Sequence, residues 1–280
     1  MRKKCSTFIT LFVVFLVSAA GAQEKYTLTF RYGAGETYRY SNDYSYDMTQ
    51  EMNGQEMKMN GSSSSIIKLF TESVAADGNI SFIISYEQMK ISMKSAMMDT
   101  TLDQNELIGK RGKVIISKFG KELGKEVIDS IKSEKGLGGG GVSALYTVNF
   151  LQLPDYSVGI GDKWVTDNID TAKIGEGYTV TNSHNEYTIL KKEEKDGHAC
   201  INIGFTSRTE TTGKIFQMGF EMFVEGSGDT QGAIWFDPAS GILVEKESNM
   251  NVDMTYALTG QMKMTIPSSQ RIRTTYKLLE

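Results

Sequence analysis

Cysteine, histidine and long apolar runs are all scarce in this chain of 280 residues. The two cysteines are Cys5 and Cys200, and Cys5 precedes the N-terminal apolar run, which excludes it as a lipoprotein acylation site. Once a leader is removed, Cys200 has no partner for an internal disulfide. A hydrophobic core must therefore hold the fold together, and the chain is long enough to build one.

One apolar run, over residues 8–17, follows three basic residues at 2–4. It is too short to span a bilayer comfortably, and the small residues at 20–22 suit a signal peptidase. We therefore predict a signal peptide over 1–22, with cleavage before Gln23, rather than a retained anchor. The mature chain would be exported to the periplasm or the cell exterior and would carry no transmembrane segment.

Basic residues are fewer than acidic ones, with 30 lysines and arginines against 34 aspartates and glutamates. The formal net charge is −4, and loss of the leader would remove three further positive charges. An acidic surface repels nucleic acid and anionic membrane surfaces, so neither is expected as a main partner.

Motifs for catalysis are missing as well. The only histidines are His184 and His198, and a strand would place His198 and Cys200 on one face as two metal ligands. A metal site needs more ligands, and the neighbouring turn favours a solvated histidine and a small half-buried cysteine. The glycine-rich stretch 136–141 lacks the lysine and hydroxyl residue of a phosphate-binding loop. We expect no enzyme activity, no cofactor and no metal site.

The most regular pattern is an alternation of apolar and polar residues that begins near residue 36. Tyrosine and methionine fall on even positions there, and this period of two predicts a strand. Asn53-Gly54 then predicts a tight hairpin turn, because both of its central residues need positive φ. The hairpin would cover about 36–71. It would pair Tyr46 with Gly61, Tyr44 with Ser63, Met48 with Met59 and Tyr40 with Ile67.

Glycine-containing turns divide the rest of the chain into further strands. We predict them at Asp77-Gly78, Phe119-Gly120, 195–197, 226–229, 237–241 and Gly260. Alternating runs lie over 26–32, 80–86, 199–205, 216–224 and 250–266, residues 178–190 are strand-like, and 113–123 is predicted to be another hairpin. A change of phase after Tyr86 predicts a β-bulge near Glu87-Gln88. A loop at Gly260 would pair Met254 with Met264 and Tyr256 with Met262.

The middle of the chain has a different pattern. Leu123, Val127, Ile128 and Ile131 have helical spacing, which predicts a helix over 122–134, and a second is predicted over about 142–151. The region 122–152 is interpreted as a helical, glycine-rich connector. The whole chain is predicted to be mainly β: a large curved antiparallel sheet or open barrel of hairpins, with one or two helices packed against it.

The two β halves on either side of this connector begin with similar sequences. Gly161-Asp162-Lys163-Trp164 echoes the stretch 35–38, and each motif precedes strands, an Asp-Gly turn and a glycine-turned hairpin. We interpret 23–121 and 153–280 as β halves of a diverged internal duplication within one continuous fold, with Trp164 in the place of Tyr38. A plain meander of hairpins would also space its glycines in this way.

Methionine is abundant, with 15 residues, most of them at strand spacing. Such side chains fill irregular cores, line adaptable faces for apolar or lipid-like ligands, or bind copper(I), although no histidine lies beside them. A ligand face would comprise Tyr40, Tyr44, Tyr46, Met48, Met59, Met254, Tyr256, Met262 and Met264. The alternative function is a structural or protein-interaction module with a packed core.

Four features together resemble a bacterial family of exported proteins known as domain of unknown function 6263. They are the stretch 35–40, the Met-x-Met strand with its Asn-Gly turn, Leu153-Pro154 before the motif 161–164, and the terminal Met-rich hairpin. The family has no assigned activity, so the resemblance implies no functional residues. The expected sheet is also similar to the half-barrel of periplasmic lipoprotein carriers, although this chain is longer and shows the repeat.

Overall fold

A computed structural model describes residues 24–96, 99–129, 150–174, 176–217, 220–259 and 263–279, so the predicted signal peptide lies outside it. Strands account for most of these residues. They are β1 (Lys25–Tyr26), β2 (Thr37–Met52), β3 (Gln55–Val74), β4 (Ile80–Ser95), β5 (Asp99–Asp103), β6 (Arg111–Ile116), β7 (Glu122–Val127), β8 (Val158–Gly159), β9 (Lys163–Ile174), β10 (Gly177–Lys195), β11 (His198–Gln217), β12 (Phe220–Asp237), β13 (Ile242–Leu258) and β14 (Met264–Leu278). A 3₁₀ turn, η1 (Asn105–Leu107), is the sole helical element within the described ranges, where no helix is long and apolar enough to cross a membrane.

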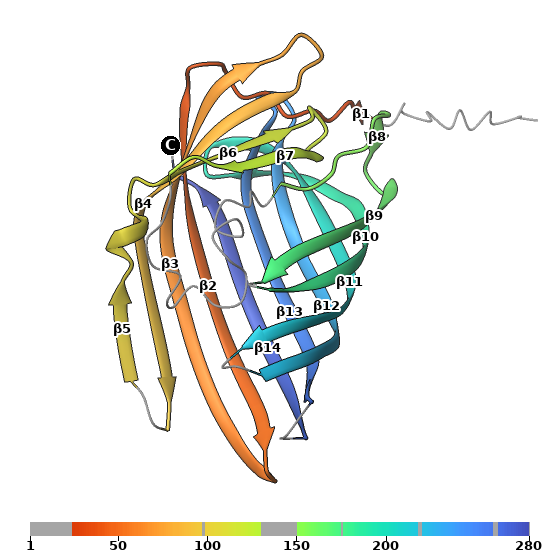
Figure 1. Cartoon of the computed structure of the whole chain (residues 1–280). Helices are drawn as coiled ribbons and strands as arrows, with labels where there is room; N and C mark the ends of the chain where they lie inside the picture. The colour runs from red at the N-terminus through yellow and green to blue at the C-terminus, as the bar shows by residue number, and fades with distance from the viewer. Residues whose placement is uncertain are drawn as a thin grey trace, which may run out of the picture.

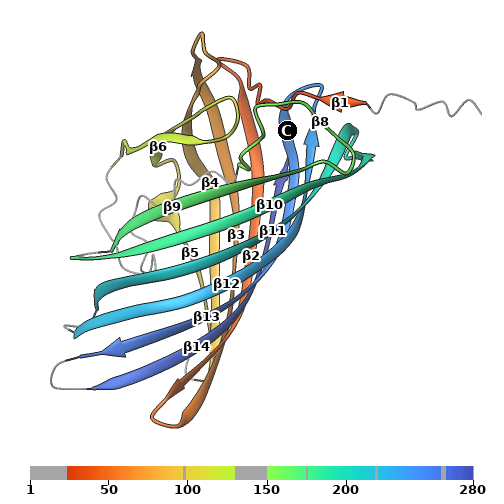
Figure 2. The ribbon, with the colours of Figure 1, turned by 90° about the vertical axis from the view of Figure 1, so that its right-hand side faces the viewer.

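Twelve strands form one antiparallel sheet that does not close. Their order is β7-β6-β4-β3-β2-β14-β13-β12-β11-β10-β9, with β5 beside β4, while β1 and β8 form a separate two-stranded sheet. The sheet curves so that β9 to β11 lie along one side and β4 and β5 along the other (Figure 1). Figure 2 shows β9 to β14 side by side. The prediction of a mainly β fold with a large curved, open sheet is confirmed.

The first hairpin has the register expected from the sequence. Tyr46 pairs with Gly61, and the other three predicted pairs are also present. Asn53 and Gly54 form the turn with φ of 53° and 74°, which is the left-handed geometry that this dipeptide favours. Even positions of β2 face the core and odd positions face solvent. Because cross-strand partners lie on the same side of a sheet, the observed pairings assign the residues of the other strands in this sheet to one of these two sides. We call these two sides the inner face and the outer face.

Most of the other predicted turns are present. Gly78, Gly120, Gly197 and Gly241 all lie between paired strands and have positive φ. The bulge is confirmed too, because Ile66 pairs with Gln88 and Ile67 with Tyr86, which leaves Glu87 as the extra residue. The bulge keeps apolar side chains of β4 on the inner face after the phase changes.

The helix expected over 122–134 is wrong where the structure describes it. Residues 122–127 form β7, which completes the hydrogen bonds of β6 at one edge of the sheet. Four apolar residues are a short pattern, and pairing with a neighbouring strand overrides such weak local preference. Residues 130–149, with most of the second expected helix, lie outside the description, and residues 150 and 151 are not helical.

The turn expected at 226–229 is also wrong, because these residues lie inside β12. Side chains from β13 occupy the space above the two glycines. A Cβ at Gly226 would lie 2.3 Å from the sulfur of Met254, and one at Gly228 would lie 2.7 Å from Cε of Met250. Glycine within a strand can thus indicate close approach by a neighbour instead of a turn.

Two more strand predictions need correction. In the last hairpin Met254 pairs with Ser268 and Tyr256 with Ile266, whereas Met264 pairs with Leu258. Met262 and Gly260 lie outside the described ranges. The run 26–32 was expected to be a strand, but only Lys25–Tyr26 pairs, with β8. The remaining residues cross one end of the large sheet in extended form.

This crossing segment builds the core at that end, which we call the core end. Leu28, Phe30 and Tyr32 are buried between the sheet and a second segment that contributes Leu151 and Leu153. The Phe30 ring contacts Phe236 edge-on at 5.5 Å, and Tyr32 contacts Phe82 at 5.1 Å. Short backbone hydrogen bonds fix the segment, from Phe30 N to Lys118 O (2.8 Å) and from Arg31 N to Gly241 O (3.0 Å).

The stretches 35–38 and 161–164 have the same local geometry. Gly35 and Gly161 have φ of 81° and 88°. Their amides donate to Thr71 O and Ile189 O at 2.8 and 2.7 Å, and the amides of those two residues donate back to Glu36 and Asp162 at 2.9 and 3.1 Å. Trp164 is buried on the inner face, as Tyr38 partly is. The likeness supports an internal duplication, which stays a prediction.

Candidate functional site

Tyr40, one of the predicted ligand-binding residues, lies in the packed core end. Its ring stacks on Tyr276 at 4.5 Å, and its hydroxyl lies 2.9 Å from the Tyr32 hydroxyl and donates to Leu243 O at 2.8 Å. Burial raises the pKa of Tyr40 and of Tyr276 well above the usual tyrosine range. The interaction of these rings is structural, and Tyr40 is not accessible to a ligand.

Beyond the core end, the inner face of β2, β3, β4, β13 and β14 carries many apolar, half-buried side chains, with polar residues such as Ser63, Gln270 and Thr274 between them. We call this surface the apolar wall. Its residues are Tyr44, Tyr46, Met48, Met57, Met59, Met89, Ile91, Met250, Val252, Met254, Tyr256, Met264 and Ile272. Seven of the predicted ligand-binding residues belong to it, so the sheet brings together residues far apart in sequence.

Side chains of the apolar wall fit over glycines of neighbouring strands. A Cβ at Gly61 would lie 2.5 Å from the Tyr46 ring, and the Met254 sulfur occupies the space above Gly226. These long side chains therefore cover the backbone of the neighbouring strands at the two glycines. The result is a broad apolar surface of rings and thioethers, which adapts readily to ligands of variable shape.

The inner face of β9 to β11 beyond the core end is polar instead. We call it the polar wall; its residues are Thr166, Asn168, Thr181, Ser183, Asn185, Ser207, Thr209 and Thr211. The hydroxyls of Thr181 and Thr211 lie 2.9 Å apart, and Asn168 accepts from Gln152 at 2.8 Å. The curved sheet therefore presents one apolar and one polar surface on the same face, and Asp170, opposite Thr181 on β9, is a charged residue on the polar one.

Three aromatic rings separate the polar wall from the core end. Trp164 stacks on Tyr187 at 5.0 Å, and Tyr187 stacks on Phe205 at 6.2 Å. Lys246 of β13 continues this row, with its ammonium 5.4 Å from the centre of the Phe205 ring. Gly232 on β12 leaves room for that ring, since a Cβ there would lie 2.5 Å from it.

Lys246 was missed in the sequence, although its position was visible there. It belongs to the same alternating run as Met250, Val252 and Met254, and in the sheet it pairs with the buried residues Ile234 and Tyr276. Burial lowers its pKa from 10.5 to about 8. The sequence signal for Lys246 is a charged residue on the same alternate positions as the apolar residues of one strand.

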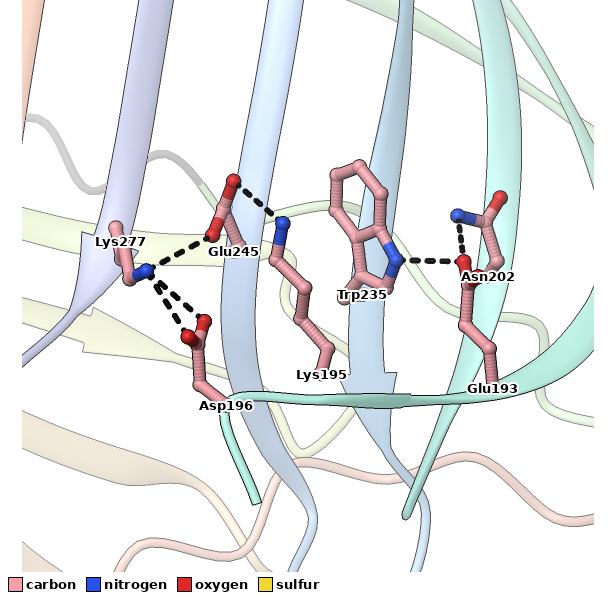
Figure 3. Close-up of polar contacts among 7 residues, drawn as sticks. All are labelled: Glu193, Lys195, Asp196, Asn202, Trp235, Glu245 and Lys277. Carbon is pink, nitrogen blue, oxygen red and sulfur yellow. Dashed lines mark hydrogen bonds and ion pairs between the residues drawn. The ribbon is translucent and has the colours of Figure 1, made fainter. Parts of the chain in front are cut away.

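A separate polar network lies on the outer face, at the β10–β11 turn (Figure 3). Glu193 accepts from Trp235 and Asn202, both at 2.7 Å, and Lys195 lies 4.1 Å from the centre of the Trp235 ring. Glu245, with its side chain 4% exposed, accepts from Lys195 at 3.0 Å. These contacts tie the turn to three neighbouring strands, so we interpret the network as structural.

Beside this network the outer face has an open hollow of about 670 Å³. Small residues create it, notably Gly204 and Ala233, and charged residues at its rim include Lys163, Glu186 and Glu247. A hydrogen bond with Glu245 raises the pKa of Glu247. The hollow is too open to enclose an apolar ligand.

The histidines and Cys200 have ordinary structural environments. His184 pairs with Asp167 at 2.7 Å and His198 with Asp237 at 3.1 Å. Cys200 is buried, and burial raises the pKa of its thiol to about 12, which makes it unreactive. Within the described residues, no three His, Cys, Asp or Glu side chains are grouped so as to hold a metal. Copper binding by methionine stays a prediction.

No protein-family model and no curated protein sequence matches the chain, so the resemblance to domain of unknown function 6263 lacks that support and stays a prediction. Among solved structures, one described as lipid–protein interactions in lipovitellin matches 89% of this chain at 10% identity, with a TM-score of 0.48. The chain spans 26% of that lipovitellin chain.

Two bacterial structures match less closely. OccK5 (OpdH) of Pseudomonas aeruginosa matches 88% of this chain and 99% of its own, at 8% identity and a TM-score of 0.27. An outer membrane channel from Pseudomonas putida F1 matches 90% and 98%, at 8% identity and a TM-score of 0.21. At these values none of the likenesses assigns a ligand or an activity to this chain.

Proposed function

We propose that this chain is an exported, non-enzymatic protein that binds an apolar, lipid-like molecule against the apolar wall. The observation that carries the proposal is the contrast between the two ends of one inner face. At the core end two chain segments cover the sheet, whereas beyond it thirteen apolar side chains remain half-buried. Soluble proteins rarely leave large contiguous apolar surfaces without a use for them.

The composition of the wall supports a ligand more than a fixed protein partner. Flexible thioethers and tyrosine rings adapt to chains of variable shape, and burial of such side chains contributes about 25 cal/mol for each Å² of apolar area removed from water. The predicted signal peptide and the acidic composition support export and solubility. The alternative function, a structural or interaction module, predicts a solid interior, and among the described residues the core end has one.

The test is a fluorescence titration of the mature chain with Nile red, a neutral apolar dye. Wild type is expected to bind it saturably. Val252→Asp should weaken this binding at least tenfold, because it places an unpaired carboxylate in the middle of the apolar wall. Asn251→Asp is the matched control, since residue 251 is the next position of β13 and faces outward. Equal binding by both variants, or none by wild type, would overturn the proposal.

A further inference from the structure

Lys246 is unusual because of where its charge lies. Beyond the core end, the inner positions of β2, β3 and β10 to β14 carry apolar, hydroxyl, amide and glycine residues. Lys246 is the one charged side chain among them. No carboxylate stands on these positions. On the edge strand β9, which lies outside this set, Asp170 pairs with Thr181 and is therefore an inner-face acid.

The position of Lys246 on the sheet is equally specific. It lies at the boundary between the core end and the apolar wall, in the middle of the sheet, where the polar wall also begins. Ser248 is the next inner position of β13, and Thr230 and Ser207 follow in the next cross-strand row. A group bound beside the ammonium would therefore also have hydroxyl donors within its reach.

A lysine that serves only packing would be a poor choice at this position. The ammonium lies 5.4 Å from the centre of the Phe205 ring, which gives modest stabilisation, and it pairs with no acid among the described residues. A half-buried ammonium without a counter-ion lowers stability. The arrangement is complete when an anion from outside the chain supplies the missing charge.

We propose that the ligand is a long-chain carboxylic acid whose carboxylate pairs with Lys246 and whose hydrocarbon chain lies along the apolar wall. This proposal rests on the proposed function and narrows it to one class of ligand. One ammonium matches one negative charge, whereas a phosphate group is usually held by several donors or by arginine. From Met250 to Tyr256 the wall extends for about 20 Å along β13, enough for a long acyl chain.

The experiment compares cis-parinaric acid with its methyl ester, a neutral probe with the same chain, by fluorescence titration of the mature protein. The acid is expected to bind wild type roughly tenfold more tightly than the ester, because the ester cannot form the ion pair. Lys246→Met should abolish this preference and leave ester binding at least as tight. Lys246→Arg should retain most of it.

Lys58→Met is the matched control. Lys58 is exposed on the outer face of β3 and pairs with Glu56, so the preference for the acid should be unchanged. Equal affinity of wild type for acid and ester, or an unchanged preference in Lys246→Met, would overturn the assignment of a carboxylate while leaving the proposed function intact. Failure of wild type to bind either probe would overturn both.

Discussion

The ammonium of Lys246 lies 5.4 Å from the centre of the Phe205 ring, on the inner face of the sheet. This relationship joins the two walls, because Phe205 ends the aromatic row above the polar wall and Lys246 begins the run that becomes the apolar wall. It also has an energetic consequence. Burial without a counter-ion disfavours the charged lysine, so the folded chain holds this proton less tightly than the unfolded chain.

Replacing Lys246 by methionine should stabilise the ligand-free protein at pH 7. Lowering the pKa from 10.5 to about 8 corresponds to a loss of roughly 3 kcal/mol, and methionine removes this loss. In wild type the unfolded chain binds the extra proton between pH 8 and 10.5, so the contribution of Lys246 makes stability rise with pH from about 8. The variant should lack this rise. Urea unfolding at several pH values measures the stability difference at pH 7 and the change of stability with pH.

The pH series should stop below pH 10. Tyr276 and Tyr40 face the same part of the sheet, and their raised pKa values mean that unfolded tyrosines ionise first, which lowers stability above that pH. The account is contradicted if Lys246→Met is less stable than wild type at pH 7 and both proteins show the same pH dependence.

Gly226→Val should destabilise the fold by roughly 1–3 kcal/mol, as expected for overpacking. The added side chain would occupy the space of the Met254 sulfur and lie close to the Asp253 carbonyl. Ser227→Val changes the adjacent outward position of β12 and should have little effect. Urea unfolding of both variants measures the difference, and equal stability would show that the Met254 side chain moves aside freely.

Tyr40→Phe should destabilise the protein by roughly 1–3 kcal/mol, because the Tyr32 hydroxyl and the Leu243 carbonyl both lose a buried partner. The half-buried Tyr256 on the apolar wall provides a comparison, and Tyr256→Phe should change the stability much less. Thermal unfolding followed by circular dichroism resolves the two. Similar losses for both variants would contradict the assignment of Tyr40 to the core and Tyr256 to the open part of the inner face.

Gly35→Ala and Gly161→Ala should each lower the stability by about 1–2 kcal/mol, since both glycines have left-handed φ angles that a Cβ disfavours. The two losses should be similar, because the surrounding hydrogen bonds correspond. Gly124 lacks a positive φ and has no atom within 4 Å of an added Cβ, so Gly124→Ala is the control. A loss at only one of the two turns would weaken the case for a repeat.

Much of the fold was predictable because strands and tight turns are encoded locally. The register of the first hairpin follows from Asn53-Gly54 together with the parity of Tyr46 and Met48. The last hairpin was placed wrongly because the turn at Gly260 was assumed from a single glycine, while the structure pairs Tyr256 with Ile266. Glycine alone does not distinguish a turn from a strand position that accommodates a neighbouring side chain.

The candidate site was only partly predictable. Alternation placed the tyrosines and methionines of the apolar wall on one face, but it could not show that Tyr40 is covered. That coverage comes from Tyr32 and the segment at 150–153, which pack across the sheet from distant parts of the sequence. Lys246 does not stand out in an apolar periodicity, because a charged residue in phase with apolar neighbours only interrupts the pattern and gives no sign that the sheet buries it.

The most direct test of the central claim is photo-crosslinking with a long-chain carboxylic acid that carries a diazirine in its tail, followed by peptide mass spectrometry. The expected adducts lie on inner-face residues of the apolar wall, such as Met48, Val252 and Met254, and unlabelled palmitate should compete for them. Adducts confined to the outer-face hollow beside Ala233, or labelling that palmitate does not reduce, would contradict the account.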